Sequence, residues 1–146
     1  MMIIGALLLA THMDACHVLT KRDIAAVQGE TFTAAKLTAR DEITQCFYQL
    51  PTFTKSVSVD VIRDKEFWKS HFDEGEKERE HEEEAHAPRE IRGVGDDALW
   101  IGGRMAGSLY VRKGNAVLRV SVGGPGTENE KIAKAKTLAA RALRRM

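Results

Sequence analysis

The sequence predicts an α+β fold: a single antiparallel sheet of 5-6 strands with helices packed on it, in the order α-βββ-α-βββ-α. Three features predict this class. Apolar and polar residues alternate strictly over Lys55–Asp64, as in a half-buried strand. Gly114-Asn115 separates two strand-like runs, as a two-residue hairpin turn does. Residues 127–146 begin with a capping box and then carry apolar side chains at helical spacing.

The first helix is predicted over Lys21–Gln28. Thr20 can cap it, and Asp23 occupies the third helical position, which completes a capping box. Gly29 is suited to the left-handed residue that ends a helix. The helix is therefore expected to have about two turns.

Three strands are predicted next, over Thr31–Arg40, Ile43–Leu50 and Lys55–Asp64. They follow one another closely enough to form a meander. The third strand has the clearest pattern, and its apolar face is expected to pack against helices through Val57, Val59 and Val61.

A central helix is predicted from Asp64 to Ala87, with an apolar patch of Phe67, Trp68 and Phe72 in its first two turns. Between Asp73 and Glu84 the chain then has eight acidic and two basic residues, a local charge of −6. Such a segment cannot pack into a core. Residues 73–87 are therefore interpreted as an acidic, solvated extension of this helix.

The last third is predicted to contain a strand at Ala98–Ile101 and a hairpin of Ser108–Lys113 with Ala116–Val122. Thr127 then opens the C-terminal helix. This helix should cover the sheet face formed by Val57, Val59, Val61, Leu109, Val111, Leu118, Val120 and Val122, through its own Ile132, Ala135, Leu138, Ala139 and Leu143.

Composition is that of an ordinary folded domain. With 146 residues, 43% hydrophobic and 29% charged, the chain is neither disordered nor fibrous. Its 22 basic and 21 acidic residues give a formal charge of +1, which removes the broad positive field of a nucleic-acid binder. No nucleic-acid partner is expected.

The N-terminus opens with ten apolar residues, Met1–Ala10, half the length of a membrane-spanning helix. Their length fits the apolar region of a secretory signal, although no basic residue precedes them. We interpret residues 1–15 as a leader remnant, or alternatively as an apolar N-terminal arm, and residues 16–146 as a single domain. The leader interpretation predicts an extracytoplasmic protein, either periplasmic or secreted.

The chain has two cysteines, Cys16 and Cys46, with no C-x-x-C pair. In an exported chain they are most simply one disulfide, whereas in a cytosolic chain they would be buried thiols. A further alternative makes Cys16 a lipid-anchored first residue and Cys46 a lone thiol. We predict the disulfide, which would tie the segment before the first helix to the second strand.

A metal site is the first chemical candidate. His81 and His86 are five residues apart, whereas the zinc-binding HExxH motif needs histidines four apart on one helix face. A weak site for a divalent cation could still combine His71, His81, His86 and Glu82, within the His/Glu-rich segment 71–86. A solvated charged helix face explains the same residues, so no metal or other cofactor is predicted.

Asp96 and Asp97, near Trp100, form the best candidate pair for acid–base catalysis. The commoner use of such a Gly-x-Gly-Asp sequence is a turn whose aspartates bind backbone N–H groups. No serine–histidine–aspartate set is recognisable, and no catalytic residue is therefore predicted.

Six basic residues and no acidic residue lie between Lys131 and Arg145. Aromatic residues that could stack on bases are missing from this stretch. Pairing with the acidic segment 73–87, or solvation, is the expected role. Membrane contact would come only from a leader or from peripheral binding of these residues to an anionic surface.

An ordered set of short motifs resembles small bacterial exported proteins and lipoproteins. The set consists of Asp14-Ala15-Cys16, Leu19–Ile24 with Gly29, Cys46-Phe47-Tyr48, Gly93–Trp100 and Leu109–Asn115. The resemblance implies an extracytoplasmic α+β domain of the sandwich type seen in PsbP-like proteins, with a paired cysteine couple. It brings no catalytic residues.

Three function classes follow from these features. A non-catalytic extracytoplasmic module that binds a protein, a peptide or an apolar ligand is expected first. A weak divalent-metal-binding protein of the cell envelope, using segment 71–86, is the alternative. An enzyme using Asp96 or Asp97 is the third, and it would need a perturbed carboxylate in a cleft.

Overall fold

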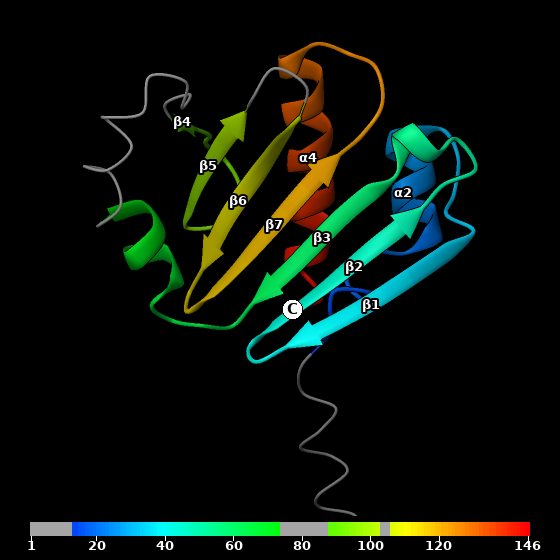
Figure 1. Cartoon of the computed structure of the whole chain (residues 1–146). Helices are drawn as coiled ribbons and strands as arrows, with labels where there is room; N and C mark the ends of the chain where they lie inside the picture. Colours follow the sequence, from blue (N-terminus) through cyan, green and yellow to red (C-terminus); the bar gives the residue numbers. More distant parts are fainter. Residues whose placement is uncertain (1–12, 74–87, 103–105) are drawn as a thin grey trace, which may run out of the picture.

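The computed structural model describes residues 13–73, 88–102 and 106–146. The fold is α+β, with one open antiparallel sheet of seven strands and helices packed on it (Figure 1). Its elements are α2 (Lys21–Gln28), β1 (Ala34–Arg40), β2 (Ile43–Gln49), the 3₁₀ turn η1 (Phe53–Lys55), β3 (Val57–Ile62), the π-helical turn η2 (Lys69–Asp73), β4 (Arg89–Glu90), β5 (Asp97–Gly102), β6 (Gly107–Lys113), β7 (Ala116–Val122) and α4 (Glu128–Leu143).

Two meanders build the sheet, in the order β1-β2-β3-β7-β6-β5-β4. They meet at the β3–β7 pair, where Val57 lies opposite Val122 and Ile62 lies opposite Val117. The expectation of 5-6 strands in two blocks of three is wrong, because β4 adds a strand to the second block. β4 consists of Arg89 and Glu90 alone, both exposed, so it has no alternation that a sequence pattern could reveal.

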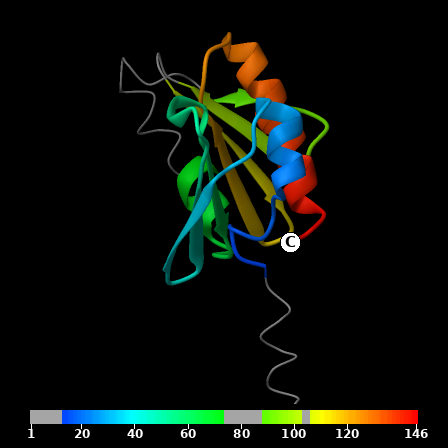
Figure 2. The ribbon, with the colours of Figure 1, turned by 90° about the vertical axis from the view of Figure 1, so that its right-hand side faces the viewer.

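Helices α2 and α4 lie on one face of the sheet, and η2 lies on the other (Figure 2). The predicted core face is confirmed: Val57 and Val59 are fully buried, and so are Leu138 and Ala139 of α4. The capping box that opens α4 is also present, since the Thr127 hydroxyl accepts from the Glu130 N–H. This face forms the hydrophobic core.

Helix α2 has its predicted bounds, its capping box at Thr20 and Asp23, and Gly29 in the left-handed conformation at φ 80°. Asp23 also has a second role. Its carboxylate is 3% exposed and accepts hydrogen bonds from Arg141 at 3.0 Å and Arg145 at 2.6 Å. Two of the C-terminal basic residues are thus paired with the buried Asp23, whereas pairing with segment 73–87 or solvation was expected.

Two elements depart from expectation by more than two residues at one end. β1 begins at Ala34, not at Thr31, because Phe32 turns inward and packs edge-on against Tyr48, with 5.0 Å between ring centroids. The helix predicted over 64–87 is reduced, in its described part, to a short helical turn ending in η2. Its aromatic residues anchor this turn on the second face of the sheet, where Phe72 packs against Tyr110 at 5.2 Å. The remaining residues of that prediction, 74–87, lie outside the described part of the chain.

Cys16 and Cys46 form the predicted disulfide, with their Cα atoms 5.0 Å apart. Because the Cys16 sulfur is bonded to Cys46, the lipid-anchor alternative is wrong for this structure. Ala15 is fully buried beside the disulfide, and its carbonyl accepts a hydrogen bond from the Tyr48 hydroxyl.

Residues 1–12 of the leader or arm lie outside the described residues. None of the helices in the described ranges is long and apolar enough to cross a membrane.

Candidate ligand-binding pocket

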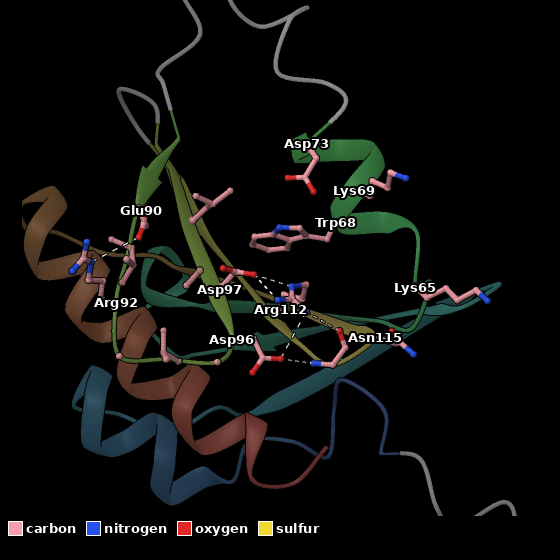
Figure 3. Close-up of a pocket in the computed structure, with 17 residues that line it drawn as sticks. Lys65, Trp68, Lys69, Asp73, Glu90, Arg92, Asp96, Asp97, Arg112 and Asn115 are labelled. Atoms are coloured by element: carbon pink, nitrogen blue, oxygen red, sulfur yellow. Dashed lines mark hydrogen bonds and ion pairs between the residues drawn. The ribbon is translucent and has the colours of Figure 1, made fainter.

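A pocket of about 710 Å³ lies at the β4–β5–β6 end of the sheet, beside η2 (Figure 3). Segment 65–73 forms one wall, and segment 90–99, from the end of β4 into β5, forms another. Arg112 and the Gly114-Asn115 turn complete the lining. We call this cavity the Trp68 pocket, after the indole that projects into it.

The floor of the Trp68 pocket is an ion pair between neighbouring strands. Asp97 of β5 lies opposite Arg112 of β6 in the sheet register. The Arg112 guanidinium donates to Asp97 Oδ2 from Nε at 2.9 Å and from Nη2 at 2.6 Å. Its Nη1 donates to the Gly114 carbonyl at 3.3 Å. These bonds hold the guanidinium in one orientation, so the floor is a fixed polar surface.

Asp96 fastens the loop to the hairpin turn. Its carboxylate accepts from the Gly114 N–H at 2.8 Å, and its own N–H donates to the Arg112 carbonyl at 2.8 Å. Just before it, Gly95 has φ 62°, and a Cβ there would lie 2.3 Å from a Val111 methyl carbon. Only glycine therefore allows the loop to approach β6 this closely.

The aromatic wall is carried by the helical turn. Trp68 is half-buried, with its ring 4.7 Å from that of Phe72. Phe72 in turn packs against Tyr110, which is on the same sheet face as Arg112. Figure 3 shows the indole between η2 and the Asp97–Arg112 pair. One part of the ring is thus fixed by packing, and the rest lines the cavity.

Charges in the lining balance one another. Four basic and four acidic side chains line the pocket: Lys65, Lys69, Arg92 and Arg112, with Asp73, Glu90, Asp96 and Asp97. Several of them are already matched, as in the Arg112–Asp97 pair and the Arg92–Glu90 pair at 3.8 Å. Such a lining offers hydrogen-bond donors and acceptors without a net attraction for anions or cations.

The structure brings together only part of the candidate set from the sequence. Asp96 and Asp97 both line the pocket, and both are about half exposed and hydrogen-bonded as described. Asp96 binds a backbone N–H, but it is that of Gly114, 18 residues away, and not a local one as the turn interpretation expects. Asp97 does not, since it is the first residue of β5 and pairs with Arg112.

The metal candidates are not gathered into a site in the described residues. His71 stacks on Phe67 with 3.9 Å between ring centroids, and its Nδ1 lies 3.0 Å from the Phe67 carbonyl oxygen. His81, Glu82 and His86 lie outside the described residues. Within residues 13–73, 88–102 and 106–146, no group of three or more His, Cys, Asp or Glu side chains could hold a metal ion.

Sequence reasoning missed Trp68, Arg112 and Asn115 as pocket residues. It assigned Trp68 to a helical core patch and Asn115 to a turn, and it gave Arg112 no role. The strand register supplies the missing signal, because it places Arg112 directly opposite Asp97.

Comparison of the chain with models of protein families, with curated proteins and with solved structures gives no match.

Proposed function

We propose that this protein is a non-catalytic binding module that works outside the cytoplasm and holds a neutral polar ligand in the Trp68 pocket. The observation that carries the proposal is the juxtaposition of a half-buried indole with a fixed, charge-balanced polar floor. Sites for small ligands typically combine an apolar surface with a few convergent polar groups in this way.

Location outside the cytoplasm is supported by the disulfide. Such bonds persist in oxidising compartments and are rare in the cytosol of most organisms. The bond joins Cys16, just before the first helix, to the buried Cys46 of the sheet, so it is part of the core. The leader-like residues at the N-terminus support the same location.

Binding is favoured over catalysis by the state of the two candidate carboxylates. Asp97 is engaged by the Arg112 guanidinium, and Asp96 is engaged by a backbone N–H. Both are about half exposed, in contrast to the secluded carboxyl groups that serve as general acids or bases. Their hydrogen bonds hold the pocket in shape, which is what a preorganised binding site requires.

The ligand that suits these walls best is a short neutral saccharide. An indole face offers a flat apolar surface on which the C–H face of a sugar ring can stack. Carboxylate oxygens of Asp96 and Asp97 can accept from sugar hydroxyls, and the Asn115 side-chain amide can both donate and accept. An apolar ligand, one of the occupants expected from the sequence, fits this polar floor less well.

Isothermal titration with the full chain tests the proposal. The probes are three neutral trisaccharides, namely maltotriose, cellotriose and tri-N-acetylchitotriose, with trilysine and triglutamate as charged controls. At least one trisaccharide should bind, and Trp68→Ala should weaken it about tenfold or more. Trp68→Phe should retain part of the affinity. Phe53→Ala, which removes an exposed aromatic ring elsewhere, is the matched control and should change nothing.

Three results would overturn the proposal: no binding of any trisaccharide, tighter binding of a charged tripeptide, or unchanged saccharide binding in Trp68→Ala. Turnover of a bound saccharide that Asp96→Asn or Asp97→Asn abolishes would overturn its non-catalytic part.

A further inference from the structure

We propose that the outer edge of β1, residues Ala34–Arg40, is a docking site for an extended acidic segment of a partner protein, which adds to the sheet as a further strand. This inference is independent of the Trp68 pocket, which is lined by residues of β4 and β5. Those strands lie at the edge of the sheet opposite to β1 (Figure 1). We call the site the β1 edge.

The two edges of the sheet differ in length and protection. β4, at one edge, has two residues, which is a common way to prevent a sheet from pairing further. β1, at the other edge, has seven residues, and six of them are exposed. Its partner on one side is β2, and within the described chain no strand pairs with its other side. The β1 edge is thus long enough to pair with an added strand.

The alternation of hydrogen-bonded residue pairs in the sheet shows which backbone N–H and C=O groups of β1 point away from β2. The Arg63 N–H donates to the Glu42 carbonyl at 2.9 Å, and these two residues continue the β2–β3 register. Hydrogen-bonded pairs alternate along an antiparallel ladder. Even-numbered β2 residues therefore bond to β3, and odd-numbered β2 residues bond to β1.

The β1–β2 register shows which β1 residues are hydrogen-bonded to β2. Lys36 lies opposite Phe47 and Thr38 lies opposite Gln45, so the backbone groups of Lys36 and Thr38 point toward β2. The intervening residues, Ala35, Leu37 and Ala39, direct their N–H and C=O groups away from the sheet. The β1 edge thus presents three consecutive donor and acceptor pairs for an incoming strand.

Side chains of β1 define the chemistry of the partner. Ala35, Leu37 and Ala39 lie on the same sheet face as the buried Cys46, and Leu37 is 49% exposed. Lys36 and Arg40 lie on the other face, and both are exposed. A matching strand therefore has small or apolar residues on one face and acidic residues on the other.

Charge argues against pairing between the β1 strands of two copies of this chain. Antiparallel pairing of two β1 strands about Leu37 would bring Lys36 and Arg40 of both copies onto one face, where like charges repel. The acidic residues nearest in sequence, Asp41 and Glu42, lie in the turn beyond the end of β1. The exposed cations therefore disfavour self-pairing and favour an acidic strand.

Fluorescence anisotropy with two labelled peptides tests whether the β1 edge prefers an acidic strand. The probes are acetyl-(Val-Glu)₄-amide and acetyl-(Val-Lys)₄-amide, which differ only in the sign of their charge. The full-length wild-type chain should bind the acidic peptide about tenfold or more tightly than the basic one. The double variant Lys36→Glu/Arg40→Glu should reverse this preference. Equal binding of both peptides, or a preference unchanged by the double variant, would overturn the proposal.

Proline substitution tests the backbone pairing. Ala35→Pro and Ala39→Pro each remove one outward N–H and leave the bonds to β2 intact, because proline is tolerated at edge positions of this kind. Each should weaken the acidic peptide about tenfold while the circular dichroism spectrum and Tm stay near those of the wild type. Full binding by both folded proline variants would refute strand addition.

Analytical ultracentrifugation of the free chain tests the choice of partner. If the free chain sediments as a dimer and Ala39→Pro converts it to a monomer, the occupant is a second copy and the proposed partner is overturned.

Discussion

Replacing Arg145 by methionine is expected to destabilise the fold although the change lies one residue from the C-terminus. Arg145 Nη1 donates to Asp23 Oδ2 at 2.6 Å and to the Val18 carbonyl at 2.9 Å. Asp23 itself is 3% exposed, and its other hydrogen-bond donors are the Thr20 N–H at 2.9 Å and Arg141 at 3.0 Å. Methionine keeps most of the apolar stem and removes both of the arginine's hydrogen bonds.

The structure sets the size of the effect. A hydrogen bond to a charged group contributes about 1.5–3 kcal/mol and a neutral one about 0.5–1.5 kcal/mol. Arg145 is about one-third exposed, and Asp23 keeps Arg141, so the loss should fall short of the sum. We expect Arg145→Met to lower the free energy of unfolding by about 2–3 kcal/mol. Asp23→Ala should cost about 3–4 kcal/mol, because it removes the capping interaction and leaves both arginines without their carboxylate.

Urea unfolding of the oxidised chain at neutral pH provides the measurement. Arg144→Met is the matched control, since Arg144 is the adjacent, exposed arginine and its loss should cost less than about 0.5 kcal/mol. A double-mutant cycle with Asp23→Asn should give a coupling of about 1–2 kcal/mol between Asp23 and Arg145. Equal destabilisation by Arg145→Met and Arg144→Met, or zero coupling, would refute the reasoning.

The same carboxylate predicts an acid dependence of stability. Burial by itself raises the pKa of Asp23, but hydrogen bonds from Thr20, Arg145 and Arg141 outweigh it and hold the pKa below its usual value. An unfolded aspartate titrates near pH 3.9, so below about pH 4 the unfolded chain takes up the proton first. The Asp23 contribution should therefore be complete above about pH 4 and lost as the pH falls further. Asp23→Asn should flatten this part of the stability curve.

Three other expectations concern the disulfide, a glycine and a tyrosine. The double variant Cys16→Ala/Cys46→Ala opens a 30-residue loop and should lose about 3–4 kcal/mol in urea unfolding by the chain-entropy model; an unchanged stability would contradict it. Gly107→Ala places a Cβ 2.2 Å from the Trp100 ring and should cost about 1–3 kcal/mol with an altered near-ultraviolet circular dichroism spectrum, whereas a wild-type spectrum and Tm would argue against this packing. Burial raises the pKa of Tyr48 well above its usual value, so stability should fall above about pH 10, where the unfolded tyrosine ionises first. Absorbance at 295 nm would disprove this if both tyrosines ionised by pH 11 with the fold intact.

Features of the fold with a local cause could be predicted from the sequence. Val57, Val59 and Val61 alternate with polar residues because only one face of β3 lies against the hydrophobic core. The two capping boxes were visible because each needs only four adjacent residues. The short strand β4 was not visible, since two exposed residues paired with β5 leave no periodic pattern.

The candidate site depended on contacts that are distant in sequence. Asp96 and Asp97 could be picked out from the sequence as candidates, but Arg112, 15 residues beyond Asp97, joins them only through the strand register. Trp68 was recognised as apolar, yet its position over that ion pair depends on where the helical turn packs. Likewise, Asp23 could be recognised as a capping residue, whereas its pairing with Arg145 spans 122 residues.

The central β3–β7 pair has a consequence for the order in which the protein assembles. Six residue pairs join β3, which ends at Ile62, to β7, which begins at Ala116. During synthesis, the two meanders therefore cannot pair until most of the chain has left the ribosome. A chain cut between residues 73 and 88 would leave two fragments, one with β1–β3 and the disulfide and the other with β4–β7 and α4. Each fragment would present one half of the same ladder to the other. We therefore expect the two fragments to associate through the β3–β7 pair and to restore the sheet when they are mixed.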